Sequence, residues 1–132
     1  MTKIYVDSSV VVAMLFGEEK SPKYREIFAR QSEILSSYLL EAEVYASARR
    51  EKIPLDSASK LLTDVTLIAP GRSLEYEYQK VFQHGYCRGG DAFHLAMMVH
   101  IDPDFSSLEL LTADRQQEEI ARKIGIKIFQ ES

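Results

Sequence analysis

The chain has few of the features that stabilise secreted or membrane proteins. It has one cysteine, Cys87, among 132 residues, which excludes an intramolecular disulfide and a cysteine-cluster zinc site. Its longest apolar run, Val10–Phe16, is far shorter than the roughly 20 residues of a membrane-spanning helix. That run also lacks a basic segment before it and a cleavage site after it. These absences predict a cytoplasmic protein without a secretory signal or membrane segment.

The chain also lacks an excess of positive charge. It has 16 Lys and Arg residues against 20 Asp and Glu residues, which gives a net charge of −4. This balance argues against a protein that holds nucleic acid on a broad basic surface. A nuclease is still compatible with it, because acids that await a cation lower the net charge while the basic groups that touch phosphates can be local.

What remains is the composition of one folded domain. Hydrophobic residues make up 45% of the chain and charged residues 27%, with 6 glycines and 4 prolines. This length is enough to bury a core but too short for two comfortable domains. We therefore expect a single domain over residues 1–132.

Short strand-like segments alternate with helical ones along the chain. The expected strands are residues 3–6, 33–37, 66–70, 108–112 and 126–129. The expected helices are residues 10–19, 23–30, 38–52, 54–65, 73–87, 91–101 and 114–125, with Gly89 and Gly90 as breakers and Gly125 as a C-cap. The alternation predicts an α/β fold with three α/β/α layers and a central, mainly parallel five-stranded sheet.

Acidic residues stand at or near the ends of these strands. Asp7 ends the first expected strand, and Asp114 follows the fourth by two residues. Asp91 opens the helix that leads back to the start of the fourth strand, while Glu41 and Glu43 lie in the first turns of the helix after the second strand. Ligands of parallel sheets bind beyond the carboxyl ends of the strands. We therefore expect four acids from four segments to meet at one edge.

Such a cluster calls for a cation. Carboxylates a few ångströms apart repel each other and raise one another's pKa unless a positive charge neutralises them. A hard divalent ion, Mg²⁺ or Mn²⁺, suits oxygen ligands, whereas the three histidines do not have the spacing of a zinc site. In such folds a carboxylate-bound ion activates water and stabilises charge on a phosphodiester.

Each acid also has a structural interpretation. Asp7, Asp91 and Asp114 are all candidate helix N-caps. Glu41 and Glu43 are about 200° apart around a helix, so both cannot face one ion, and the local periodicity does not choose between them. The four acids together favour a site, because caps have no reason to collect beside strand ends with an extra acid on a helix.

Four segments, residues 4–19, 36–51, 89–99 and 110–129, resemble in order the acidic motifs of PIN-domain ribonucleases. The likeness is to the small VapC-type toxins of toxin–antitoxin pairs in particular, and it spans Lys3 to Phe129. The most specific parts are an Asp-Ala-aromatic-His-Leu-Ala helix start at Asp91 and a Leu-Thr-x-Asp strand end at Asp114.

The resemblance implies a Mg²⁺- or Mn²⁺-dependent endoribonuclease that leaves 5′-phosphate and 3′-hydroxyl ends. It also implies a homodimer and a cognate antitoxin as partner. The implied catalytic and metal-binding residues are Asp7, Glu43, Asp91 and Asp114, with Glu43 preferred to Glu41 only by the resemblance. The implied supporting residues are Thr112 and Ser8.

Two other functions compete with this one. A non-catalytic scaffold of the same fold is the first, and the presence of all four acids counts against it. A signalling receiver domain is the second, and it requires an Asp after the third strand and a Lys at the end of the fifth. Residues 66–71 contain no acid, and Lys127 falls inside its strand. His94, one helical turn after Asp91, is interpreted as a packed core residue.

Overall fold

The computed structural model describes residues 3–31 and 33–130, and it contains one parallel five-stranded sheet. The strands are β1 (Lys3–Val6), β2 (Ile34–Ser37), β3 (Thr66–Ile68), β4 (Leu108–Leu111) and β5 (Lys127–Ile128). The helices are α1 (Ser8–Phe16), α2 (Ser21–Arg30), α3 (Tyr38–Arg50), α4 (Leu55–Leu62), α5 (Glu75–Phe82), α6 (Gly89–Ile101) and α7 (Arg115–Ile124). None of the described helices is both long and apolar enough to cross a membrane.

The sheet has the strand order β3-β2-β1-β4-β5, and all four pairings are parallel. Strands β2 and β3 follow one another on one side of β1, and the chain then crosses to the other side of β1, where it forms β4 and β5. This reversal makes the gap between β1 and β4 the topological switch point of the sheet, where ligands of open α/β folds bind.

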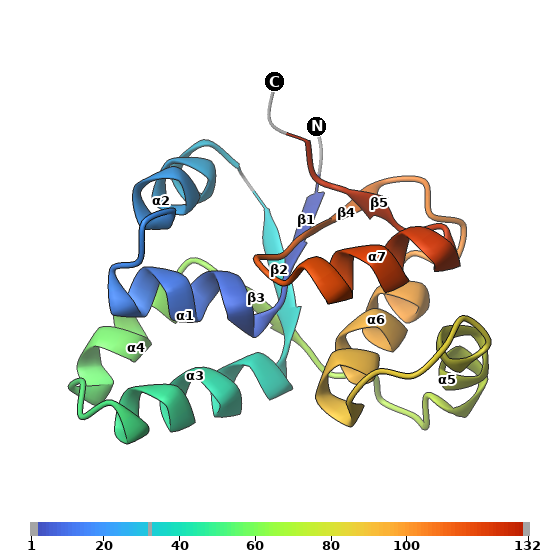
Figure 1. The fold of residues 1–132 in the computed structure, drawn as a ribbon, viewed down its shortest axis with the longest axis horizontal. Coiled ribbons are helices and arrows are strands. Elements are labelled where there is room, and N and C mark those ends of the chain that lie inside the picture. Colours follow the sequence, from blue (N-terminus) through green and yellow to red (C-terminus); the bar gives the residue numbers. More distant parts are fainter. Residues whose placement is uncertain (1–2, 32, 131–132) are drawn as a thin grey trace.

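Alternating residues of β1 send side chains into two separate cores, as the two-residue period of a strand requires. Ile4 and Val6 pack into a core with α1, α2, α3 and α4, whereas Tyr5 packs into a core with α5, α6 and α7. Figure 1 shows these two groups of helices on opposite faces of the sheet. The predicted three-layer α/β/α architecture is therefore confirmed, with all five strands present and each at most as long as expected.

Several predicted helix boundaries are wrong. Helices α1 and α4 end three residues earlier than expected, at Phe16 and Leu62, and α1 and α2 each begin two residues earlier. Two further differences have clear causes. The helix expected over residues 73–87 is shorter, because α5 ends at Phe82 and Gly85 has a φ of 122° that a helix cannot continue through. The glycines expected to break the chain are instead the first two residues of α6, and Arg88 is its N-cap. Glycine is tolerated there because the first amides of a helix have no intrahelical partner to lose.

The strand order also excludes the receiver fold. Receiver-type sheets have the order 2-1-3-4-5, in which the first strand lies between the second and the third. Here β1 lies between β2 and β4, and β3 is an edge strand. The switch point of this sheet therefore lies between β1 and β4, not between β1 and β3.

Glycines with a positive φ should respond to substitution differently from the glycines in the first turn of α6. Gly125, the C-cap of α7, has a φ of 106° and a Cβ there would lie 3.5 Å from the Phe105 ring. Gly125→Ala should lower the free energy of unfolding by about 1 kcal/mol or more, because alanine is strained at positive φ. Gly89→Ala is the control, since its Cβ would meet nothing within 4 Å, and it should lose no stability. Urea unfolding of both variants measures the difference, and equal losses would contradict these boundaries.

Candidate metal centre

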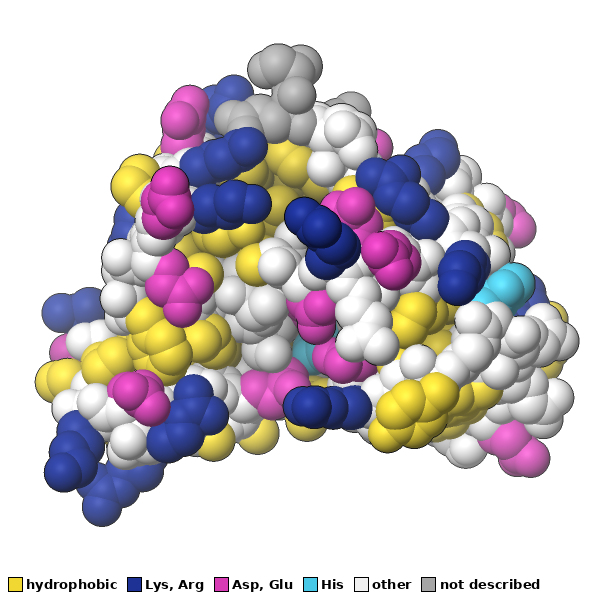
Figure 2. Space-filling view, viewed as in Figure 1, with side chains coloured by type: hydrophobic (Ala, Val, Ile, Leu, Met, Phe, Trp, Pro, Cys, Tyr) yellow, Lys and Arg dark blue, Asp and Glu magenta, His cyan; other side chains and the backbone are white. Residues whose placement is uncertain are grey.

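The predicted site lies just past the paired ends of β1 and β4. The two strands are in register with Val6 opposite Leu111, so the next residues, Asp7 and Thr112, come side by side. Thr112 Oγ1 donates a hydrogen bond of 2.5 Å to Asp7 Oδ2. Figure 2 shows acidic side chains around a hollow in this region, with a histidine recessed between them.

Asp7 is almost fully buried, with 3% of its surface exposed. Burial raises the pKa of its carboxyl group, and hydrogen bonds from Ser9 and Thr112 oppose that rise. Ser9 donates to Oδ1 twice, from its hydroxyl at 2.5 Å and from its backbone amide at 3.1 Å. Asp7 is thus the N-cap of α1 as well as a buried acid. The resemblance had implied Ser8 as the supporting residue beside Asp7. In the structure, the hydroxyl that bonds to Asp7 belongs to Ser9.

Thr112 connects Asp7 to Asp114. Its hydroxyl accepts a hydrogen bond of 3.0 Å from the backbone amide of Asp114 while it donates to Asp7. Asp114 Oδ1 caps α7 by accepting from the amides of Gln116 and Gln117 at 2.9 and 3.3 Å. The hydroxyl of Thr112 therefore ties the segment after β4 to Asp7, the residue that follows β1.

Asp91 is the predicted acid with the fewest partners. It lies in the first turn of α6 without being its N-cap, and it is half-buried. Among residues 3–31 and 33–130, none donates a hydrogen bond to its carboxylate. Burial raises the pKa of this carboxyl group, and the negative charges of Asp114 and Glu43 raise it further. Asp91 therefore lies within electrostatic reach of two other predicted acids.

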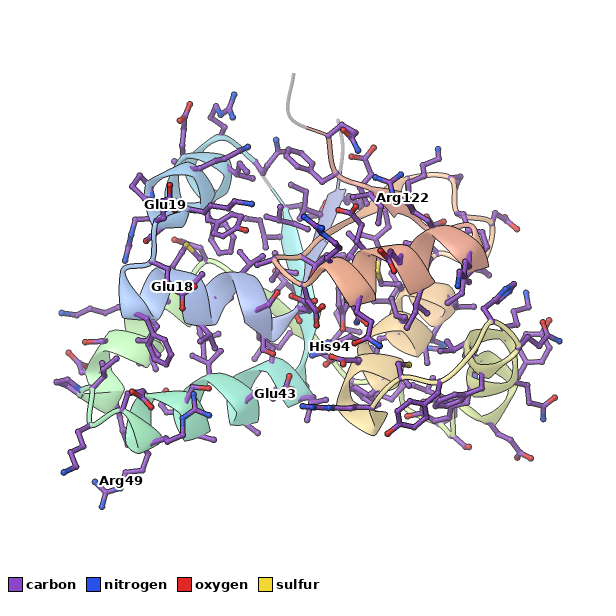
Figure 3. All side chains as sticks on the ribbon, in the orientation of Figure 1. Glu18, Glu19, Glu43, Arg49, His94 and Arg122 are labelled. Atoms are coloured by element: carbon purple, nitrogen blue, oxygen red, sulfur yellow. The ribbon has the colours of Figure 1, made fainter. Side chains whose placement is uncertain are left out.

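The structure separates the two candidate glutamates on α3. Glu43 Oε1 lies 2.8 Å from Nε2 of His94 on α6, and the side chains point toward one another in Figure 3. Glu41 lies away from this contact on the exposed side of the helix. The Glu43 side chain is 31% exposed, and only its Oε1 atom is bonded to His94. A Cβ on Gly90 would lie 3.4 Å from the second oxygen, Oε2, so a glycine leaves room where α6 begins.

His94 joins Glu43 to the interior of the sheet. It is 1% exposed, and its Nδ1 lies 2.8 Å from the hydroxyl of Tyr5, which is fully buried in β1. Because Glu43 can only accept, His94 Nε2 must carry a proton, and a neutral imidazole then accepts from Tyr5 at Nδ1. His94 is packed in the core as expected, yet it also orients a predicted site residue. One indication in the sequence that His94 lies near the site is its position one helical turn after Asp91.

Gln117 is a second residue that the sequence analysis missed. Its Nε2 donates a hydrogen bond of 3.1 Å to the backbone oxygen of Asp91, which ties α7 to the start of α6. Its Oε1 is buried without a partner in the described part of the chain. Its position three residues after Asp114 places it on the inner side of the first turn of α7.

The donor set fits a hard divalent ion in its chemistry. Every predicted ligand offers carboxylate oxygens, which Mg²⁺ and Mn²⁺ prefer, and burial raises the pKa of both Asp7 and Asp91. In the described residues, no three His, Cys, Asp or Glu side chains lie close enough together to hold a metal ion. The predicted acids thus lie near one edge of the sheet without forming a closed set of ligands.

Comparison with known proteins identifies a family. The model of the PIN domain matches residues 4–123, which include all four predicted acids and most of the chain. No curated protein matches the chain.

The Tyr5–His94–Glu43 chain of hydrogen bonds predicts a stability effect. Tyr5→Phe should lower the free energy of unfolding by about 1–3 kcal/mol, because it leaves His94 Nδ1 buried without a partner. Tyr76→Phe is the control, since Tyr76 is 62% exposed. Chemical denaturation measures both, and ¹⁵N NMR of the wild type should find the His94 proton on Nε2. Equal stability of the two variants, or a proton on Nδ1 alone, would contradict this hydrogen-bond chain.

The burial of Asp7 predicts how metal and pH change stability. A carboxyl group with a raised folded-state pKa destabilises the fold at neutral pH, and that cost disappears as the pH falls through the raised value toward 3.8. Without metal, Asp7→Asn should therefore be at least as stable as the wild type at pH 7, since Asn also caps helices. At pH 4 that difference should shrink.

Metal should reverse the order of the two proteins. With Mn²⁺ at about 100 times its Kd, the wild type should gain about 2.7 kcal/mol and Asp7→Asn much less. Thermal unfolding with Mn²⁺ and with chelator measures both gains. A variant that is less stable without metal, and that gains as much from Mn²⁺ as the wild type, would show that Asp7 acts only as a cap.

Proposed function

Because the chain belongs to the PIN-domain family, whose members are typically metal-dependent nucleases, we propose that it is a Mg²⁺- or Mn²⁺-dependent endoribonuclease. Its substrate is RNA, and its reaction is hydrolysis of internal phosphodiester bonds. The products carry 5′-phosphate and 3′-hydroxyl ends.

One observation supports this proposal: acids from four segments lie near the switch point of the sheet, although no three of the described side chains are close enough together to hold a metal ion as they stand. Asp91 feels the charges of Asp114 and Glu43, and Asp7 is joined to the Asp114 segment by Thr112. In the described residues the hydrogen-bond partners of Asp7, Asp114 and Glu43 are hydroxyls, backbone amides and one imidazole, which orient the carboxylates. Arg88 lies near enough to Asp91 to oppose the rise of its pKa.

The residues have distinct roles in this proposal. When bound, a divalent ion supplies an activated water and stabilises the charge that builds up on the phosphate. Asp7, which follows β1, and Asp91 in α6 would hold such an ion, with Asp114, the N-cap of α7, completing the set. Glu43, which is hydrogen-bonded to His94, would accept a proton from the attacking water or serve as a further ligand. Ser9 and Thr112 keep the Asp7 oxygens in place.

We propose further that the protein is the toxin of a toxin–antitoxin pair, acting in the cytoplasm as a homodimer. The likeness of its four acidic segments to VapC-type toxins supports this role. Self-association is supported by large hydrophobic side chains that are exposed on the single chain: Tyr38, Leu55, Tyr76, Phe82 and Tyr86. A short open reading frame directly before this one, and a dimer in sedimentation experiments, are the observations that bear on it.

The nuclease proposal predicts the effect of one substitution. Asp91→Asn should abolish cleavage of a mixed RNA pool in Mg²⁺ or Mn²⁺, because it removes a carboxylate that no other group replaces. Its melting temperature without metal should not fall, since the Asp91 carboxylate accepts no hydrogen bond from the described residues. Sequencing of the cut ends checks the products, and chelator should stop the reaction.

Glu41→Gln is the matched control, because Glu41 lies two residues from Glu43 on the exposed side of α3. It should cleave as the wild type does, while Glu43→Gln should be strongly impaired. Cleavage by Asp91→Asn at the wild-type rate would refute the proposal. A wild type that neither cleaves RNA nor melts differently with metal would identify the non-catalytic scaffold instead.

A further inference from the structure

A groove leads away from the acids between α2 and α7. It encloses about 410 Å³, with Leu111 and Phe129 among its apolar lining residues and Thr112 at the end nearer the acids. A second hollow of about 270 Å³ continues it to Asp114 and Arg115. The two share Lys20, Thr112 and Glu118, so they form one trough that reaches the predicted metal centre.

Basic residues line this trough on both sides, although the chain as a whole is negative. Lys20 and Lys23 line it from the α2 side, and Arg115 and Arg122 line it from α7. All four are exposed, and Figure 2 shows Lys and Arg side chains on either side of the area above the acidic hollow. Arg122 is labelled on α7 in Figure 3.

We infer that this trough binds the backbone of the RNA strand next to the bond that is cut. The inference rests on the proposed nuclease function for the identity of its ligand. A groove with cations on both walls and Phe129 in its lining suits a single strand, whose phosphates meet the cations while a base stacks on the aromatic ring. Double-stranded RNA instead needs an extended surface across its wide minor groove.

Besides Asp114, the trough is lined by one further acid, Glu118 on α7, which has a defined partner. Glu118 Oε2 lies 3.4 Å from Arg122 Nη2, one helical turn away on α7. The pair is solvent-exposed and worth little to the fold, so Arg122 can exchange Glu118 for a phosphate. Glu118 therefore weakens RNA binding in this arrangement, and its removal should strengthen it.

The test measures RNA binding without cleavage. The protein carries Asp91→Asn, and the probe is a fluorescein-labelled single-stranded RNA of about ten nucleotides. The test variant adds Lys20→Gln, Lys23→Gln and Arg122→Gln. The control variant adds Arg50→Gln, Lys60→Gln and Lys80→Gln, which remove equal charge from helices that do not line the trough. Anisotropy gives Kd between about 50 and 200 mM salt, and melting temperatures check that each variant is folded.

The test variant should bind about tenfold or more weakly at low salt, and its log Kd should depend less steeply on log salt, by about 0.7 per lost phosphate contact. The control variant should keep its slope, and Glu118→Gln should bind more tightly than its parent. Equal slopes for test and control variants, or weaker binding by Glu118→Gln, would overturn the inference.

Failure of the nuclease proposal has a different outcome. If the wild type does not cleave RNA but the test variant loses affinity and salt slope, the trough binds RNA and the proposed chemistry is wrong. If the wild type cleaves RNA and the test variant binds RNA as tightly as its parent does, with the same salt slope, the chemistry is right and the strand takes another path.

Discussion

The parallel pairing of β1 with β4 is the constraint on which the site depends. It puts Asp7 beside Thr112, and from there the chain enters α1 on one side of the sheet and α7 on the other. Helices α3 and α6 also begin at this edge, with Glu43 and Asp91 near their starts. Four helix N-termini, each with a partial positive charge, thus converge where four carboxylates lie. Asp7, Asp91 and Asp114 lie at the cap or in the first turn of their helices, where this partial charge favours a carboxylate.

The four acids are held very unequally. Asp7 has two hydroxyls and an amide, Asp114 has two amides, and Glu43 has a buried imidazole. Asp91 has none of these among the described residues, and its pKa is raised. Three acids are therefore positioned by hydrogen bonds. Asp91 is influenced by its surroundings and by neighbouring charges alone: burial, Asp114 and Glu43 raise its pKa, and His94 and Arg88 oppose that rise.

The sequence was most informative where local chemistry decides position. Asp7 and Asp114 are strand ends and helix caps at once, and both roles can be recognised from neighbouring residues. Cap geometry also favours Ser9 over Ser8, because an N-cap side chain accepts from the second or third helical amide. By contrast, the contact of His94 with Glu43 joins residues 51 positions apart, and that with Tyr5 spans 89. No local pattern distinguishes Glu43 from Glu41. The two differ in a tertiary contact, because Glu43 is hydrogen-bonded to His94. Gly89 and Gly90 were misread because propensity matters little in the first turn of a helix.

The net charge of −4 is compatible with an RNA ligand because of how the charges are arranged. At physiological ionic strength, charges more than about 8 Å apart at the surface are largely screened, so a phosphate responds to the groups beside it and not to the total. In the trough those groups are Lys20, Lys23 and Arg122, with Glu118 already paired to the last. Beyond Thr112 the field reverses, and the acids repel a phosphate that arrives without a cation. In the proposed mode of binding, the same strand would be attracted along the trough and would reach the acids only together with a metal ion, so binding of the substrate would be coupled to binding of the metal.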